Sequence, residues 1–206
     1  MVAFLAVSCG VAVVYGLWLC HGPVSVWRSV VKTVPVALLA VWAAMAGGPV
    51  WLVAALGLSA VGDFALSREG ERAFLVGLCA FALAHVAYIA LLLGLVAGAP
   101  PVVPVVVLLA LAVSTELWLA PFAGEMRWPV RGYVVLITVM AGCALALPGA
   151  LWVAAVGAGA FVLSDTLLAV QMFRRDVAAR FDRVLSVALW TLYFGAQVMM
   201  AVALAG

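Results

Sequence analysis

Two aspartates lie in apolar stretches of the sequence, where a charged side chain is costly. Asp63 follows Gly62 near the end of one stretch, and Asp165 follows Ser164 near the end of another. One charge at the centre of a membrane span costs from roughly 2.5 to over 10 kcal/mol, so ionisable residues there usually belong to functional sites. If the two carboxyl groups meet in a poorly solvated site, both cannot ionise easily. The pair then supplies an acid and an anion for acid–base chemistry; the alternative is a structural ion pair or a capped helix end.

Polar and aromatic side chains recur with helical spacing in two further apolar stretches. One set between Phe74 and Tyr88 shares a helical face, and so does another set between Arg183 and Gln197. Such faces either line a site or form ordinary hydrogen bonds between packed helices. With other polar residues of the apolar stretches, they give these candidate substrate-binding residues: His85, Tyr88, Tyr133, Ser164, Tyr193, Gln197 and Glu116.

The remaining residue types narrow the chemistry. A zinc hydrolase needs about three histidines around its metal, and the chain has only His21 and His85. No P-loop, dinucleotide-binding or nucleophile-elbow motif is present. Once these sites are excluded, a pair of carboxyl groups is the remaining candidate for catalysis, and no metal site is expected. Glu116 lies close to the loop that contains Arg127, so pairing with an interfacial arginine is an alternative to a place in the site.

The elements that position these residues are apolar segments of about membrane-spanning length. Of the 206 residues, 69% are hydrophobic and 9% are charged, against about a quarter charged in soluble domains. We therefore expect an all-α polytopic membrane protein with a single transmembrane domain, residues 1–206. Its eight helices are predicted at residues 2–20, 33–46, 50–66, 73–97, 101–120, 129–147, 150–172 and 184–205. The second is expected to be tilted, kinked or partly re-entrant, because Pro35 lies just inside it.

The basic residues predict how the chain crosses the membrane. With eight spans, all ten lysines and arginines fall at alternate connections, and Arg28 and Lys32 are assigned to the first loop. Excess Lys and Arg in short loops marks the cytoplasmic side, so both termini are predicted to lie outside. Arginine supplies nine of the ten basic residues, and Ala, Val and Gly dominate the composition. This pattern indicates a bacterial protein, which we expect in the cytoplasmic membrane.

The positions of the aspartates suggest an internal duplication. Asp63 and Asp165 are 102 residues apart, each near the cytoplasmic end of the third helix of a four-helix half. Glu116 is expected at a comparable depth and His85 nearer the midplane. Residues 1–100 and 101–206 would then be parallel repeats, which place sites at their interface. Glycines near both aspartates permit the two aspartate helices to pack closely and bring the carboxyl groups face to face.

Landmarks along the chain resemble a known family. They are Gly62-Asp63-x-x-Leu66, Phe74-x-x-Gly77-x-x-x-Phe81-x-x-x-His85-x-x-Tyr88, Tyr133 with Met140 and Ala144, Ser164-Asp165-x-x-Leu168, and Tyr193 followed by Gln197. In this order, and over nearly the whole chain, they resemble the YhhN family of membrane proteins, which includes the vertebrate lysoplasmalogenases. The most specific of these landmarks are the two aspartates and the helix with His85 and Tyr88.

The resemblance implies an eight-helix enzyme that hydrolyses the vinyl ether bond of a lysoplasmalogen. The products would be a fatty aldehyde and glycerophosphoethanolamine or glycerophosphocholine, with Asp63 and Asp165 as catalytic residues and no metal or organic cofactor. The chain of the lysophospholipid would lie among the spans. Loop arginines would hold its phosphate: Arg68, Arg72, Arg174, Arg175, Arg180 and Arg183.

A second class of function remains open on the same residues. A transporter or sensor for lipids or small solutes also uses intramembrane aspartates, as proton or ligand sites, and suits a repeated fold. Release of aldehyde from a lyso-alkenyl phospholipid distinguishes the two. Membrane lipids are the expected surroundings in either case, no nucleic-acid partner is expected, and the sequence carries no indication of an oligomeric state.

Overall fold

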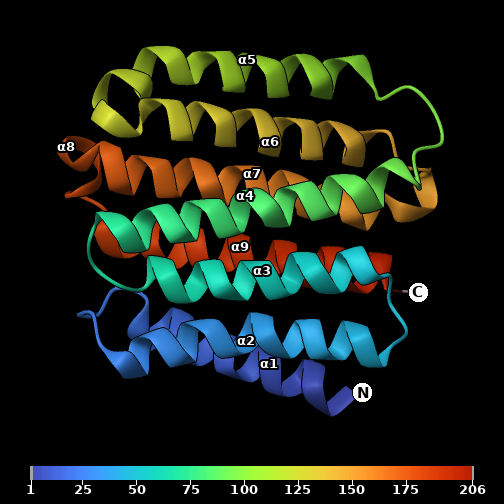
Figure 1. Ribbon diagram of the computed structural model, residues 1–206, viewed down its shortest axis with the longest axis horizontal. Coiled ribbons are helices and arrows are strands. Elements are labelled where there is room, and N and C mark those ends of the chain that lie inside the picture. Colours follow the sequence, from blue (N-terminus) through green and yellow to red (C-terminus); the bar gives the residue numbers. More distant parts are fainter. Residues whose placement is uncertain (1, 206) are drawn as a thin grey trace.

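The computed structural model describes residues 2–205 as a bundle of helices that run side by side (Figure 1). No strand occurs in this part of the chain. A π-helical turn, Tyr15–Leu19, extends the first helix. The helices are α1 (Val2–Val14), α2 (Val26–Met45), α3 (Val50–Leu66), α4 (Glu71–Leu93), α5 (Val102–Trp118), α6 (Arg127–Leu145), α7 (Trp152–Phe173), the short α8 (Arg175–Ala178) and α9 (Asp182–Leu204).

The helices have the length and composition of membrane spans. Seven stretches of the described chain are long and apolar enough to cross a membrane, and α3 is a shorter apolar helix of 17 residues. The all-α membrane class predicted from composition is therefore confirmed. Apart from the second, the predicted segments agree with the helices to within a few residues at each end.

The second helix differs from its prediction. α2 begins at Val26 rather than at residue 33 and continues unbroken through Pro35 to Met45, so a re-entrant segment is wrong. Ser25 caps its start, since the Ser25 side chain accepts a hydrogen bond from the backbone N–H of Arg28 at 3.1 Å. Arg28 and Lys32 consequently lie within α2, whereas the sequence pattern predicts them in a loop. A charge normally ends a span, but here Lys32 has a carboxylate partner inside the bundle.

Close packing occurs within two pairs of helices. α3 packs most extensively on α4, and α7 packs on α9. At Gly62 of α3 an added Cβ would lie 2.6 Å from ring atoms of Phe81 on α4, and at Gly157 of α7 it would lie 3.0 Å from the Met200 side chain on α9. Within the described residues α3 does not pack along α7. The expected face-to-face packing of the two aspartate helices is therefore wrong, because their small residues admit other neighbours.

The bundle has two distinct ends and an outlying helix (Figure 1). The connections α1–α2, α3–α4, α5–α6 and α7–α9 gather at one end, opposite the two labelled termini. The basic residues lie in these connections or on the adjoining helical turns, except Lys32, which is further inside α2. Helix α5 runs along one edge of the bundle, contacts mainly α6, and buries none of its residues. An apolar face of α5 is thus free to border a groove.

Candidate active site

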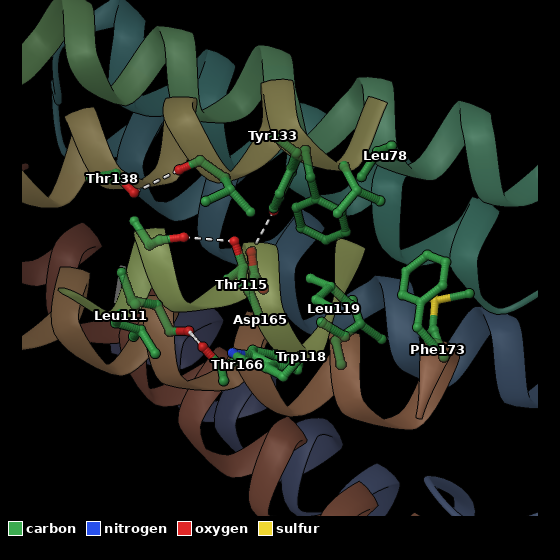
Figure 2. A pocket seen from close by; sticks show the side chains of 18 of the residues that line it. Leu78, Leu111, Thr115, Trp118, Leu119, Tyr133, Thr138, Asp165, Thr166 and Phe173 are labelled. Atoms are coloured by element: carbon green, nitrogen blue, oxygen red, sulfur yellow. Dashed lines mark hydrogen bonds between the residues drawn. The ribbon is translucent and has the colours of Figure 1, made fainter. Parts of the chain in front are cut away.

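Asp165, on α7, is oriented by neutral hydroxyl groups. Tyr133 of α6 donates its hydroxyl hydrogen to Asp165 Oδ2 at 2.5 Å. The Ser164 hydroxyl lies 3.3 Å from Oδ1, and its shorter hydrogen bond, at 2.9 Å, goes to the carbonyl oxygen of Phe161. Figure 2 shows Tyr133 and Asp165 pointing toward one another. No basic side chain among the described residues forms an ion pair with this carboxyl group. Its orientation is fixed by hydrogen bonds, while its charge state is left without a fixed cation to stabilise the anion.

An apolar groove includes this carboxyl group in its wall (Figure 2). Helices α4, α5, α6 and α7 supply most of its walls, and its volume is about 90 Å³. Asp165 is the single acidic or basic residue among the described residues that line it: Leu66, Phe74, Leu78, Phe81, Leu108, Leu111, Ala112, Thr115, Trp118, Leu119, Val130, Tyr133, Val134, Thr138, Val162, Asp165, Thr166, Leu168, Ala169, Met172 and Phe173. Such a wall suits a hydrocarbon chain and brings an acid against it.

Asp63 has a different set of partners. Its side chain, on α3, is 1% exposed, and its Oδ2 accepts a hydrogen bond from the Tyr193 hydroxyl of α9 at 2.6 Å. Its Oδ1 lies 3.4 Å from Nζ of Lys32 on α2, whose side chain is 15% exposed. The carboxylate is therefore charge-balanced inside the bundle, which a buried anion requires. Asp63 itself lines neither the apolar groove nor a second, polar cavity, but its partner Lys32 lines the polar cavity.

Aromatic rings fill the space between the two aspartates. The ring centroid of Tyr193 lies 5.5 Å from that of Phe161, which lies 4.9 Å from the imidazole of His85. The imidazole in turn lies 5.2 Å from the ring of Tyr133. The tyrosine that holds Asp63 is thus connected, ring against ring, to the tyrosine that holds Asp165.

His85 carries an unused hydrogen-bonding atom. Its Nδ1 lies 2.6 Å from the carbonyl oxygen of Phe81, and a carbonyl only accepts, so Nδ1 carries the hydrogen. In the neutral ring Nε2 is then an acceptor, and it has no partner among the described residues although the side chain is fully buried. Buried polar atoms are nearly always paired, with protein or with water. His85 lines neither of the two cavities, so a buried water molecule is the natural partner of this atom.

Tyr88 and Gln197 join α4 to α9. The Tyr88 hydroxyl donates to Gln197 Oε1 at 2.6 Å, and both side chains are buried. Gln197 Nε2 lacks a partner among the described residues. The pair behaves as a hydrogen bond between packed helices, which was the alternative to a direct place in the site.

A second, polar cavity adjoins the groove. Its volume is about 300 Å³, and its cationic members are on α2. It is lined by Tyr15, Cys20, His21, Gly22, Arg28, Lys32, Leu66, Leu168, Gln171, Met172, Asp182, Ser186, Leu189 and Trp190. Three of these, Leu66, Leu168 and Met172, also line the apolar groove, so the two cavities share a wall.

Several predicted site residues lie apart from both cavities. Glu116 pairs with Arg131, with side chains 44% and 34% exposed, which is the interfacial pairing considered as its alternative. Its position gives no support to a substrate-binding role. Arg174 pairs with Asp176 at 2.8 Å, and the guanidinium holds the pKa of the Asp176 carboxyl below its usual value. None of the proposed head-group arginines lines either cavity: Arg68, Arg72, Arg174, Arg175, Arg180 and Arg183.

Sequence reasoning missed Lys32 and Arg28. Both were treated as loop charges, yet a second span starting at residue 33 has only 14 residues before Gly47, short of the roughly 20 that a span needs. A start near Ser25, a favoured N-cap residue, restores the length and puts Lys32 inside the bundle. Within the described residues no group of three or more His, Cys, Asp or Glu side chains is placed to hold a metal ion.

Comparison with known proteins agrees with the landmarks. Residues 27–204 match the profile of the YhhN family. Two curated proteins named lysoplasmalogenase, from Mycobacterium bovis and Mycobacterium tuberculosis, are each 35% identical to this chain over 159 residues, or 73% of it. The match covers 58% of each relative, less than two thirds of its length. No solved structure matches the chain significantly. By the extent of the profile match and the similarity to these lysoplasmalogenases, the chain belongs to the YhhN family.

Proposed function

We propose that this protein hydrolyses the vinyl ether bond of a lysoplasmalogen, releasing a fatty aldehyde and a glycerophospho-alcohol. The observation that carries the proposal is a carboxyl group without a cationic partner, Asp165, in the wall of an apolar groove. A vinyl ether is cleaved by proton transfer to its β-carbon, which gives an oxocarbenium ion. A site for this reaction therefore needs an acid beside the end of the hydrocarbon chain that is attached to the glycerol oxygen.

Asp165 is the proposed general acid. Its neutral neighbours, the hydroxyl groups of Tyr133 and Ser164, orient the carboxyl group without supplying a cation that would hold it ionised. Proton transfer from Asp165 to the β-carbon breaks the carbon–carbon double bond and leaves a carboxylate next to the new cation. Opposite charges then stand close together in an apolar environment, where their attraction is strong.

Asp63 is the proposed permanent anion. Lys32 keeps its carboxylate charged, and Tyr193 fixes its direction. Because Asp63 lines neither cavity, its contribution to the cation is electrostatic and acts across the aromatic rings. Two carboxyl groups with different surroundings divide the roles of acid and anion, as in glycosidases.

The remaining step is the addition of water. The unpaired Nε2 of His85 is a suitable acceptor for one hydrogen of a water molecule between the rings. Water adds to the oxocarbenium carbon, its proton returns to Asp165, and the resulting hemiacetal collapses to the aldehyde and the free alcohol. The acid is regenerated in its starting state, so the cycle needs no other reactant.

We also propose eight membrane spans with both termini outside the cytoplasm, in a bacterial cytoplasmic membrane. Helix α3 has 17 residues, and about 1.5 Å per residue makes it about 26 Å long, close to the hydrocarbon thickness of a bilayer. If α3 is counted as a span, the connections that carry the basic residues all lie at one end of the bundle, as they do in Figure 1. The extensive pairs α3 with α4 and α7 with α9, each carrying one aspartate, support two related halves in a single domain.

Aldehyde release from a defined lipid tests the proposal. Purified protein in detergent is given a 1-alkenyl lysophospholipid, and aldehyde is followed by coupled reduction with NADH. The saturated 1-alkyl analogue is the matched substrate control, and the Asp165→Asn protein is the matched enzyme control. We expect aldehyde only from the alkenyl lipid with the wild-type protein. No release by the folded wild type would overturn the proposed hydrolase and favour a transporter or sensor. Near-normal release by Asp165→Asn would instead overturn the assignment of Asp165 as the acid.

A further inference from the structure

Arg28 brings a positive charge to the polar cavity without a carboxylate partner. Its Nε donates to the carbonyl oxygen of Leu19 at 3.0 Å, and its Nη2 donates to that of Cys20 at 3.1 Å. Neither acceptor carries a formal charge, and Arg28 belongs to none of the ion pairs within residues 2–205. A guanidinium fixed by backbone carbonyls and not neutralised is suited to bind a phosphate ester, to which arginine donates parallel hydrogen bonds.

Lys32 adds a second cation to the same wall. It lies four residues after Arg28 on α2, and side chains at this spacing share a helical face. Its ammonium group contacts Asp63 at 3.4 Å and also borders the cavity. Two cations and one carboxylate leave this side of the cavity with a net positive charge.

Asp182 of α9 adds a negative charge to the lining of the cavity. It lies in the first turn of α9, and its side chain is exposed. Gln171 Nε2 lies 3.4 Å from its Oδ1, and no ion pair within the described chain includes it. A cavity with a cationic wall and an anionic rim complements a zwitterion.

The apolar groove lies next to the cavity. Leu66, Leu168 and Met172 line both spaces, so a chain in the groove and a polar group in the cavity meet at these three side chains. At about 300 Å³ the cavity is at the lower end of the range for small-molecule sites. An amphipathic molecule with one chain and one zwitterionic end matches both volumes and both linings.

We propose that this cavity binds the head group of a zwitterionic lysophospholipid, with its phosphate on Arg28 and Lys32 and its ammonium group at Asp182. The inference rests on the proposed function for the identity of the lipid that occupies the groove. It assigns the head group to α2 and α9 in place of the six loop arginines considered from the sequence. The glycerol would then lie at the three shared side chains, Leu66, Leu168 and Met172, and the sn-1 ether would lie beside Asp165.

Binding of uncleavable lipids tests the inference apart from catalysis. Saturated 1-alkyl lysolipids have no vinyl ether bond, so their binding is measurable whether or not the protein is a hydrolase. Three of them are titrated into the purified full-length protein in detergent by isothermal calorimetry: an alkyl-glycerophosphoethanolamine, an alkyl-glycerophosphate and an alkylglycerol. They share the chain and differ only in the phosphate and the ammonium group.

Each variant has its own expected pattern. Arg28→Gln should weaken the binding of both phospholipids about tenfold or more and leave the binding of the alkylglycerol unchanged. Arg28→Lys should retain most of the affinity for the phospholipids. Asp182→Asn should weaken the binding of the ethanolamine lipid only. Arg127→Gln is the matched control, because Arg127 also donates through Nε to a backbone carbonyl, that of Ala120 at 3.2 Å, but lines neither cavity. It should bind all three lipids as the wild type does.

Several results would overturn the inference. Arg28→Gln binding all three lipids normally, or losing the alkylglycerol equally, would show that no phosphate is held there. Losses confined to Arg174→Gln and Arg175→Gln would move the head group to the α7–α9 connection. Displacement by inorganic phosphate as effective as by glycerophosphoethanolamine would make the cavity a site for free phosphate. The expected discrimination without any aldehyde release would support this inference while refuting the proposed hydrolase.

Discussion

The ion pair between Lys32 and Asp63 gives a stability prediction that does not depend on the reaction. Lys32→Met removes the ammonium group and keeps an unbranched side chain of similar bulk. The carboxylate of Asp63, 1% exposed, then retains the Tyr193 hydroxyl as its remaining partner. An unpaired charge inside the bundle should destabilise the folded state.

The magnitude follows from the geometry in two ways. At 3.4 Å two unit charges attract by about 5 kcal/mol with an effective dielectric constant of about 20. Removing one partner of a buried ion pair typically costs about 3–5 kcal/mol, and Asp63 is able to reduce this cost by taking up a proton. We therefore expect Lys32→Met to lower the free energy of unfolding by about 3–4 kcal/mol. Lys32→Met combined with Asp63→Asn should recover most of that loss, because neither charge remains.

Unfolding by SDS in mixed micelles, followed by circular dichroism, measures these differences as a double-mutant cycle. Arg131→Met is the matched control, because it breaks an ion pair whose partners, Arg131 and Glu116, are 34% and 44% exposed. Exposed pairs contribute little, so this variant should unfold much as the wild type does. A loss below about 1 kcal/mol for Lys32→Met, or a double variant no more stable than the single one, would refute the reasoning.

Four further outcomes are expected from the site and the topology. Asp63→Asn and Asp165→Asn should each abolish most aldehyde release, and the double variant should be little worse, since residues that act as a unit are not additive; multiplicative losses would contradict this. Tyr133→Phe keeps the ring but removes the hydrogen bond to Asp165, so kcat should fall about tenfold or more with KM nearly unchanged; an unchanged kcat contradicts it. Ala112→Phe fills the groove and should raise KM for long chains more than for short ones, and an equal rise would exclude chain binding there. Alkaline phosphatase fused to the C terminus should be active in cells and inactive when inserted at Gly70, and the reverse would invert the predicted topology.

Residue type and helical spacing identified Asp165 and Tyr133, which line the apolar groove, but they did not predict the pairings of the site residues. Spacing shows which side chains share a face of a helix, and it does not show which helix that face meets. Tyr193 was identified on α9, yet its bond to Asp63 on α3 depends on how the two helices cross. The glycines were recognised as points of close approach, but the neighbour at Gly62 is Phe81 of α4 and not the second aspartate helix.

The basic residues show a more specific reason for error. A charge in a short loop and a charge with a buried partner look alike in a sequence, because the partner is distant along the chain. Lys32 and Asp63 are 31 positions apart and on different helices. The charge rule therefore grouped the basic residues at one end of the bundle but assigned Lys32 to a loop. Span length is the signal that distinguishes the two cases, since α2 reaches 20 residues only if it includes both Arg28 and Lys32.

The unequal partners of the aspartates bear on how one chain obtains both an acid and an anion. Two carboxyl groups in equivalent positions of related halves would share the same surroundings and the same charge state. In the proposed repeat, in which α6 corresponds to α2, α2 gives Asp63 a lysine, whereas α6 gives Asp165 the tyrosine Tyr133. A cation favours the ionised form, and a neutral hydroxyl accommodates either form. Divergence at this one pair of positions is therefore sufficient to separate the two roles, and a Tyr133→Lys protein should lose its acid while keeping Asp165 in place.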